Sequence, residues 1–274
     1  MKKFLMLTAL LAMLVAPSAA LAENPVLMMA TTTSTDNTGL LDVLAPMFTA
    51  DTGIDLRWTA VGTGKALAMG RNCDVDVLLV HAPGAEMKEV EAGAAIDRTQ
   101  LMYNDFVILG PASDPAAVKG MSVVDALKTI ASKEAVFASR GDNSGTHKKE
   151  LSLWKGAKLE VPDKADWYVQ TGQGMLPTIR VAAEKNGYTM TDRGTFIKYE
   201  ADNGGNPPLI VLVEGDKTLF NQYSAMSVNP AKCPVAKHDL AVKFIEWMAS
   251  PKGQKAVGEF RLMGKQLFTP NAGM

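Results

Sequence analysis

The sequence is poor in the side chains that form metal and redox centres. Its 274 residues include two cysteines, Cys73 and Cys233, and three histidines. Neither cysteine belongs to a Cys-x-x-Cys motif, so a zinc site is not expected. In an oxidising compartment the two cysteines could pair across the long loop between them. The sequence sets no distance between them, however, so whether they form a disulfide stays undecided at this point.

An excess of charge of one sign is also absent. The chain carries 28 basic and 29 acidic residues, for a net charge of −1. Nucleic acids and anionic membrane surfaces select strongly basic proteins. We therefore expect neither of these as a partner, and we expect the protein to be a monomer.

The N-terminus has the order of features that is typical of a secretory signal peptide. Two lysines open it, an apolar stretch spans residues 4–15, and the small residues that follow end at Ala22. This stretch is shorter than the roughly 20 apolar residues of a membrane span, and no cysteine nearby could carry a lipid. We expect residues 1–22 to be a signal peptide cleaved after Ala22, which places the soluble protein in the periplasm.

Short apolar strands alternate with helical patterns along the rest of the chain, which predicts an α/β fold. Residues 75–80 and 106–109 are typical of buried strands, and residues 54–60 alternate as a half-buried strand does. A helical pattern over residues 40–53 contains Pro46, at which we expect a kink or an early end. No internal repeat and no low-complexity segment is visible in this sequence.

A run of hydroxyl side chains, Thr31, Thr32, Thr33 and Ser34, lies between an apolar strand and a helical pattern. A helix start has unpaired N–H groups and a partial positive charge, so hydroxyls there favour an anion as the missing partner. The alternative is a purely structural helix cap and turn.

Two further strand-to-helix turns carry the same chemistry. The first is Val61-Gly62-Thr63-Gly64, whose glycines let backbone N–H groups approach a ligand, although the surrounding sequence is not a Walker P-loop. The second contains Arg140, followed by Ser144, Gly145 and Thr146 at a helix start. The arginine fork suits an oxyanion, and its alternative is a salt bridge with Asp142.

The three turns are more informative together than singly. In an open α/β sheet such turns meet at the carboxyl ends of the strands, where ligands bind. The set contains donors only, which suits a fully ionised oxyanion. We therefore predict an oxyanion site formed by these residues: Thr31, Thr32, Thr33, Ser34, Thr63, Arg140, Ser144, Gly145 and Thr146.

With these motifs the sequence resembles periplasmic tungstate-binding proteins, the solute receptors of ABC importers. The resemblance covers almost the whole chain after the signal peptide. It is carried by the export signal, the hydroxyl run, and these segments: 61–64 (VGTG), 76–83 (DVLLVHAP), 103–106 (YNDF), 139–147 (SRGDNSGTH) and 188–195 (YTMTDRGT).

The resemblance implies a two-lobed, type II-like periplasmic binding fold, in which each lobe is a mixed sheet flanked by helices. Lobe one would hold residues 25–105 together with 225–274, and lobe two residues 106–224. Two segments would cross between the lobes, near residues 103–110 and 223–230. Tungstate, or else molybdate, would be held between the lobes and delivered to a membrane permease. No cofactor and no enzymatic activity are implied.

Two other readings stay open. A phosphate or sulfate receptor, or an anion sensor, would share the fold and much of the site. A serine hydrolase is a weaker alternative, suggested by Ser144 and His147 in Gly141-Asp142-Asn143-Ser144-Gly145, but the Gly-x-Ser-x-Gly elbow is missing.

Overall fold

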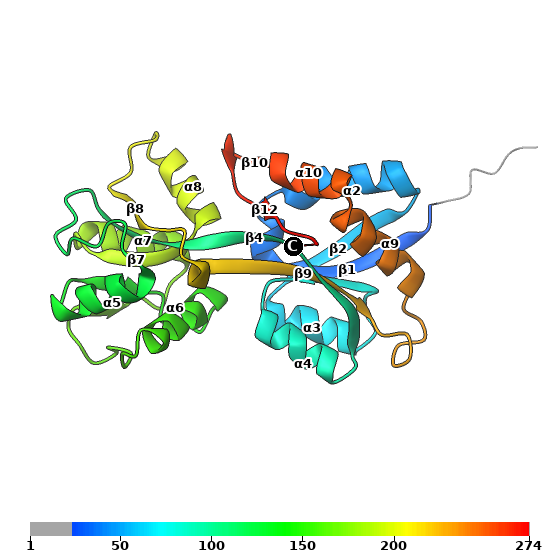
Figure 1. The fold of residues 1–274 in the computed structure, drawn as a ribbon, viewed down its shortest axis with the longest axis horizontal. Helices are drawn as coiled ribbons and strands as arrows, with labels where there is room; N and C mark the ends of the chain where they lie inside the picture. Colours follow the sequence, from blue (N-terminus) through cyan, green and yellow to red (C-terminus); the bar gives the residue numbers. More distant parts are fainter. Residues whose placement is uncertain (1–23, 274) are drawn as a thin grey trace, which may run out of the picture.

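The computed structural model describes residues 24–273, so the predicted signal peptide and its cleavage point lie outside the described residues. The molecule has two halves, which we call lobe one and lobe two. Two long strands, β4 (Ala95–Pro111) and β9 (Phe220–Val228), run between them (Figure 1). Ten strands form one continuous sheet. Its order is β2-β1-β3-β9-β4-β7-β5-β6, and β8 and β12 each pair with β4.

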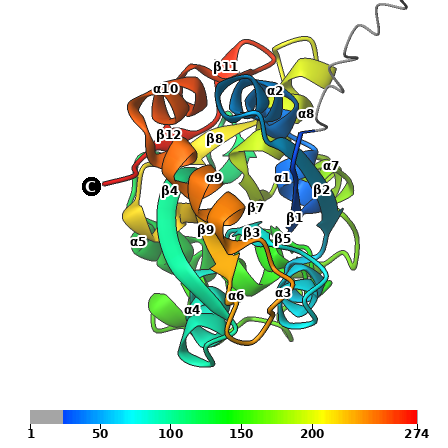
Figure 2. The same ribbon diagram turned by 90° about the vertical axis from the view of Figure 1, so that its right-hand side faces the viewer.

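Lobe one is a mixed sheet covered on both faces by helices. Its strands β1 (Val26–Thr32), β2 (Asp55–Val61) and β3 (Val77–Val80) are parallel, and β9 joins β3 antiparallel. Helices α2 (Leu40–Thr52), α9 (His238–Ala249) and α10 (Pro251–Glu259) lie on one side of it. Helices α3 (Thr63–Arg71) and α4 (Pro83–Glu91) lie on the other side (Figure 2).

The alternation of side chains along the strands explains these two faces. Leu27 and Met29 on β1 pack with α2, α9 and α10, whereas Ala30 packs with α3. A strand points successive side chains to opposite faces, so one apolar strand supplies both cores. Short α1 (Thr33–Asp36) follows β1 directly, and the strands β10 (Arg261–Leu262), β11 (Lys265–Gln266) and β12 (Thr269–Pro270) end the chain.

Lobe two repeats this plan with different elements. Its strands are β5 (Phe137–Ser139), β6 (Tyr168–Gln170), β7 (Tyr188–Asp192) and β8 (Leu209–Val213). Its helices are α5 (Val123–Ser132), α6 (Gly145–Gly156), α7 (Met175–Glu184) and α8 (Arg193–Asp202), with the 3-10 turn η1 (Lys217–Leu219) before β9. One core packs α5 and α6 on the sheet, and the other packs α7 and α8.

The first crossing between the lobes lies within the predicted segment. Strand β4 pairs with β9 up to Asp105 and with β7 from Phe106 onward. Arg193, at the start of α8, braces this point: its Nε and Nη2 donate to the two carboxylate oxygens of Asp105 over 2.5 and 2.6 Å, and Nη2 also donates to Glu214 over 2.7 Å.

The second crossing differs from the prediction. Leu219 packs in the core of lobe two, whereas Phe220 already pairs with Asp105 and the strand continues beside β3. The chain therefore returns to lobe one at 219–220, and the expected segment 223–230 was placed a few residues too late. Leu219 and Phe220 are adjacent apolar residues, so periodicity could not locate the crossing between them.

Two further features concern lobe one. Helix α2 runs through Pro46 to Thr52, so the expected early end at this proline is wrong.

Cys73, after α3, is bonded to Cys233, after β9, with an S–S distance of 2.10 Å. Within residues 24–273 no helix is both long and apolar enough to cross a membrane.

Candidate functional site

The predicted turns lie at the carboxyl edges of two parallel sets of strands. In lobe one, Thr32 at the end of β1 is level with Val61 at the end of β2, and Thr31 is level with Leu79 on β3. In lobe two, β5, β6 and β7 are also parallel, and Ser139 on β5 is level with Gln170 on β6. The register of each sheet therefore brings together residues that are far apart in the sequence.

The structure separates the residues of the hydroxyl run. Thr31 is fully buried, and its Oγ1 donates to the carbonyl of Leu79 over 2.8 Å. Its hydroxyl hydrogen is thus used inside the sheet, and we remove Thr31 from the expected ligand set. Thr32 caps α1 by accepting from Thr35 N over 3.2 Å, while Thr33 and Ser34 are exposed. The structural alternative therefore holds for the first two threonines.

His81 lies beside the hydroxyl run and was not among the predicted site residues. It follows β3, and its Nε2 lies 3.0 Å from both Thr32 Oγ1 and Ser34 Oγ. Its ring stacks on Tyr223, with centroids 4.6 Å apart. The histidine stands next to an apolar strand, where it is easily taken for a loop residue. The signal that could have found it is its place at the end of the strand beside β1.

Thr63 begins α3, two residues after the end of β2 at Val61. The cap of this helix is Gly62, which has no side chain to satisfy the first N–H groups, and Gly62, Gly64 and Lys65 are all exposed. A Cβ at Gly62 or Gly64 would meet open space, so the approach to this helix start is unobstructed. The first turn of α3 therefore presents free donors and one hydroxyl to a ligand.

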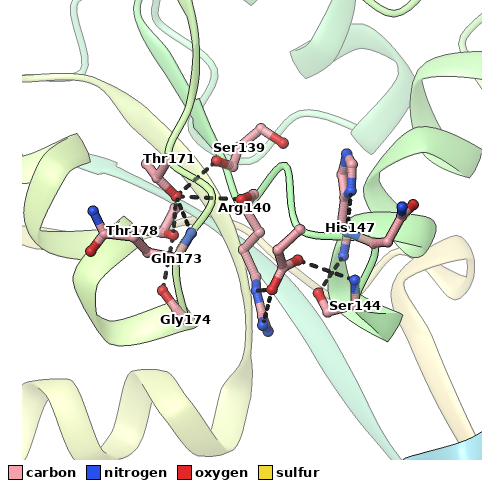
Figure 3. Close-up of polar contacts among 10 residues, drawn as sticks. Ser139, Arg140, Ser144, His147, Thr171, Gln173, Gly174 and Thr178 are labelled. Carbon is pink, nitrogen blue, oxygen red and sulfur yellow. Dashed lines mark hydrogen bonds and ion pairs between the residues drawn. The ribbon is translucent and has the colours of Figure 1, made fainter.

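The Arg140 loop places a guanidinium group near Ser144 (Figure 3). Nε and Nη2 of Arg140 lie 3.1 and 2.5 Å from Oδ2 of Asp142, while Oδ1 of Asp142 accepts from Ser144 N over 3.1 Å. Burial alone would raise the pKa of Asp142, but hydrogen bonds from Ser144 and Arg140 outweigh it and lower that pKa. Asp142 thus stays ionised and holds the guanidinium.

Ser144 is the cap of α6 and accepts from His147 N over 3.3 Å. Gly145 and Thr146 occupy the first turn of this helix, where N–H groups have no partner within the helix. Because Asp142 pairs with Arg140 and also holds Ser144, the arginine and the helix start form one unit. The salt bridge and the anion site are therefore compatible, since Nη1 of Arg140 has no hydrogen-bond partner among the described residues.

A fourth turn, Thr171 to Gly174, lies against the Arg140 loop and was not predicted (Figure 3). Thr171 Oγ1 lies 3.2 Å from the Ser139 carbonyl and 2.8 Å from Thr178 Oγ1. Gly141 has a φ of +60°, and a Cβ there would stand 2.9 Å from Gln170 Cβ. The loop can therefore approach β6 only with glycine at this position.

A buried carboxylate fixes the strand end beneath Arg140. Glu150 on α6 accepts from Ser139 Oγ over 2.7 Å, from Tyr168 Oη over 2.6 Å and from Trp154 Nε1 over 3.0 Å. Burial raises the pKa of Glu150 although these donors oppose it, and burial also raises the pKa of Tyr168. Trp154 is fully buried in this core.

The two lobes meet beside the site. Lys198 on α8 donates from Nζ to the carbonyl of Asn37 over 2.9 Å, and Asp192 at the end of β7 acts electrostatically on His81. The oxygens of Asp192 accept from Thr195 N and Oγ1 over 2.9 and 2.6 Å, so this carboxylate is occupied as the cap of α8.

The geometry does not support the hydrolase alternative. His147 Nδ1 accepts from Asn143 N over 3.0 Å, while Ser144 Oγ accepts from the backbone of His147. No hydrogen bond joins the serine hydroxyl to the imidazole, so a base for a serine nucleophile is missing here. Among residues 24–273 there is no group of three or more His, Cys, Asp or Glu side chains that could hold a metal ion.

Comparisons with known proteins agree with this architecture. A family model described as a PBP superfamily domain matches residues 19–252. The chain is 47% identical over 239 residues to the tungstate-binding protein TupA of Campylobacter jejuni, covering 87% of this chain and 88% of that protein. The chain belongs to the TupA family. It is also 46% identical over 251 residues to the family member from Peptoclostridium acidaminophilum, covering 90% of this chain and 86% of that one.

Solved structures of this family have the same fold. The TupA-family tungstate-binding protein from Desulfovibrio alaskensis G20 superimposes with a TM-score of 0.90 at 74% identity, covering 90% of this chain and 99% of that one. A structure described as the tungstate ABC transporter from Geobacter sulfurreducens has a TM-score of 0.72 at 48% identity, covering 86% and 98%. The predicted periplasmic binding fold is thereby confirmed.

Proposed function

We propose that this TupA-family protein is the solute receptor of an ABC importer and that it binds tungstate, with molybdate as the second candidate ligand. The observation that carries the proposal is the unit of Arg140 and the α6 start. It combines a guanidinium, held by Asp142, with the free N–H groups of Gly145 and Thr146. A binding protein of this kind carries no catalytic group.

The proposed ligand set has one part on each lobe. Lobe one contributes the exposed Thr33 and Ser34 and the start of α3 at Thr63. Lobe two contributes Arg140, the cap residue Ser144 and the α6 N–H groups of Gly145 and Thr146. Thr32 stands behind Ser34 and acts through it, and Thr31 is excluded because its hydroxyl hydrogen is used by β3.

Ionisation and size give this set its selectivity. Asp142 already accepts from Arg140 and Ser144, and Asp192 already accepts from Thr195. A protonated ligand would have to compete with these donors for an acceptor. Tungstate and molybdate are fully ionised tetrahedral dianions and need only donors, whereas phosphate is partly protonated near neutral pH. Sulfate has the same charge but is smaller, so it would reach fewer donors in a site shaped for tungstate.

Delivery follows from the two-part site. Bonds to both lobes exist only when the lobes approach each other, so the ligand favours a closed form. In the proposal, residues 25–105 with 220–273 move as one body against residues 106–219, and the chain bends at the two crossings. The closed receptor, a monomer in the periplasm, then docks on the permease of the importer.

Calorimetric titration of the purified protein with tungstate, molybdate, sulfate and phosphate tests the proposal. We expect the order of affinity to begin with tungstate and to end with phosphate and sulfate. Tightest binding of phosphate would overturn the ligand assignment. Mass spectrometry of the protein exported by a two-membrane bacterium tests the location, and we expect a mature chain that begins at Glu23.

A further inference from the structure

Three atoms of lobe one form a hydrogen-bonded triangle at the proposed anion site. They are Thr32 Oγ1, Ser34 Oγ and His81 Nε2, and each of the three separations is 3.0 Å. Thr32 is almost completely buried, while Ser34 is exposed. The triangle therefore has an exposed corner at Ser34 and a buried corner at Thr32.

The other nitrogen of His81 determines which hydrogen-bonding role Nε2 takes. His81 Nδ1 lies 3.1 Å from Asn221 Oδ1, and Asn221 Nδ2 donates to Asn104 Oδ1 over 2.8 Å. The amide of Asn221 therefore presents its oxygen to the ring, and Nδ1 must carry the hydrogen. In the neutral imidazole this leaves Nε2 with a lone pair, which makes it an acceptor.

Burial of the His81 ring favours this neutral form. Burial lowers the pKa of His81, although the hydrogen bond to Asn221 and the negative charge of Asp192 act in the opposite direction. The titratable side chains that face it are Asp192, at the end of β7, and Tyr223 on β9, whose own pKa is raised by burial. At neutral pH the ring is thus an uncharged acceptor behind the hydroxyl run.

The triangle contains two hydroxyl hydrogens and one acceptor that has none to give. Thr32 Oγ1 accepts from Thr35 N over 3.2 Å and also lies 2.7 Å from Thr35 Oγ1. With the Thr35 hydroxyl as the donor of that second bond, the hydrogen of Thr32 goes to Nε2. If Nε2 takes that hydrogen, Ser34 keeps its own for an anion. If Nε2 is missing, the two hydroxyls can bond to each other, and the hydrogen of Ser34 can turn inward.

We propose that His81 is a positioning residue for oxyanion recognition, because Nε2 takes the hydrogen of Thr32 and thereby leaves the Ser34 hydroxyl to donate to the ligand. The ring orientation on which this depends is held by the Asn221–Asn104 pair. These two residues are direct partners in the β4–β9 ladder and stand beside the lobe crossing. The inference rests on the proposed anion site and adds a residue outside the predicted set.

Two substitutions separate this role from simple packing. In His81→Asn the amide can replace Nδ1 but nothing reaches the position of Nε2, whereas in His81→Gln the amide oxygen can replace Nε2 and the bond to Asn221 is lost. By calorimetry we expect H81N to weaken tungstate binding about 10-fold, the scale of one hydrogen bond to a charged group. H81Q should restore most of that loss. Equal affinity of H81N and wild type, or tighter binding by H81N than by H81Q, would overturn the proposal.

A double-mutant cycle tests the route of the effect. If His81 acts through Ser34, H81N should cause little further loss in a Ser34→Ala background but its full loss in a Thr63→Val background. Equal losses in both backgrounds would overturn the proposal. His238→Asn, at the start of α9 in the same lobe, is the matched control and should bind tungstate as the wild type does.

Thr32→Val keeps the proposal testable if H81N does not fold. Without the Thr32 hydrogen, Nε2 must take that of Ser34, and we expect a loss of similar size. Wild-type affinity in a folded T32V protein contradicts the proposal. Failure of the wild type to bind tungstate would instead overturn the proposed function, whereas tight wild-type binding with an indifferent H81N would overturn only the role of His81.

Discussion

Arg140 and Asp142 form an ion pair in which two guanidinium nitrogens contact the same carboxylate oxygen, Oδ2, with Nη2 at 2.5 Å. The second oxygen of Asp142 holds the backbone of Ser144 at the cap of α6. One aspartate thus aligns the arginine with a helix start. The side chains of the pair are only 19% and 21% exposed, so the orientation of the arginine is restricted.

Substitutions of Arg140 should weaken tungstate binding in an order set by geometry. Arg140→Lys keeps the charge but loses the planar fork, and we expect a loss of about 10-fold or more. Arg140→Gln loses both, for which we expect about 100-fold, and Arg140→Glu should abolish binding by repulsion. Calorimetry measures these affinities, and circular dichroism checks the fold.

Arg57→Gln is the control for the charge change. Arg57 is exposed on β2 and pairs with Asp55, so its loss removes one positive charge away from the proposed site. Its tungstate affinity should stay within about 2-fold of wild type. An R140Q protein that binds tungstate as tightly as R57Q would show that Arg140 is not a ligand.

Glu150→Gln should change how stability depends on pH. Burial raises the pKa of Glu150 in the folded protein, so its contribution to stability is complete below the unfolded pKa, near 4.5, and is lost as the pH rises through the folded pKa. The variant lacks this titration and loses an acceptor, at about 1–3 kcal/mol. Its deficit relative to wild type should therefore be largest near pH 4 and shrink toward pH 8.

Urea unfolding at a series of pH values measures this difference. Only the difference between the two proteins is informative, because other groups titrate equally in both. A deficit that grows with rising pH would mean that the pKa of Glu150 is lowered in the folded state, which contradicts the role of burial.

Gly141→Ala should destabilise the Arg140 loop. The residue has a positive φ, and the new Cβ would collide with Gln170 on β6, so we expect a loss of about 1–3 kcal/mol in the free energy of unfolding. Displacement of the loop should also weaken tungstate binding. The matched control is Gly145→Ala, where a Cβ meets open space and the fold should be at least as stable. Equal unfolding midpoints of the two variants would contradict this account.

The double substitution of Cys73 and Cys233 by serine should lower the free energy of unfolding by about 2–4 kcal/mol, since the bridge closes a loop with a sequence separation of 160. Tungstate affinity should hardly change. Cys73 lies before β3, at the opposite end of that strand from His81. Denaturant unfolding and calorimetry measure the two quantities, and a large loss of affinity with little loss of stability would be the contrary result.

Local patterns were enough to predict the α/β class, the hydroxyl run and the Arg140–Asp142 loop. Alternation and helix-start chemistry involve neighbours in the chain, which a sequence displays directly. The first crossing also fell within its predicted segment. The second did not, because Leu219 and Phe220 are adjacent apolar residues that differ only in their packing partners, which the sequence does not show.

The sequence by itself determined which donors the predicted turns have: hydroxyls and glycines at strand ends, and Arg140 before the start of α6. Only the tertiary structure decided which of them are free. Thr31 and Ser34 are chemically alike, yet the parallel register of β1 and β3 uses the hydroxyl of Thr31 within the sheet and leaves Ser34 exposed. The same register brings His81 beside Thr32, at a separation of 49 residues. Hydrogen bonds between distant residues depend on strand pairing, and strand pairing is not a local property of the chain.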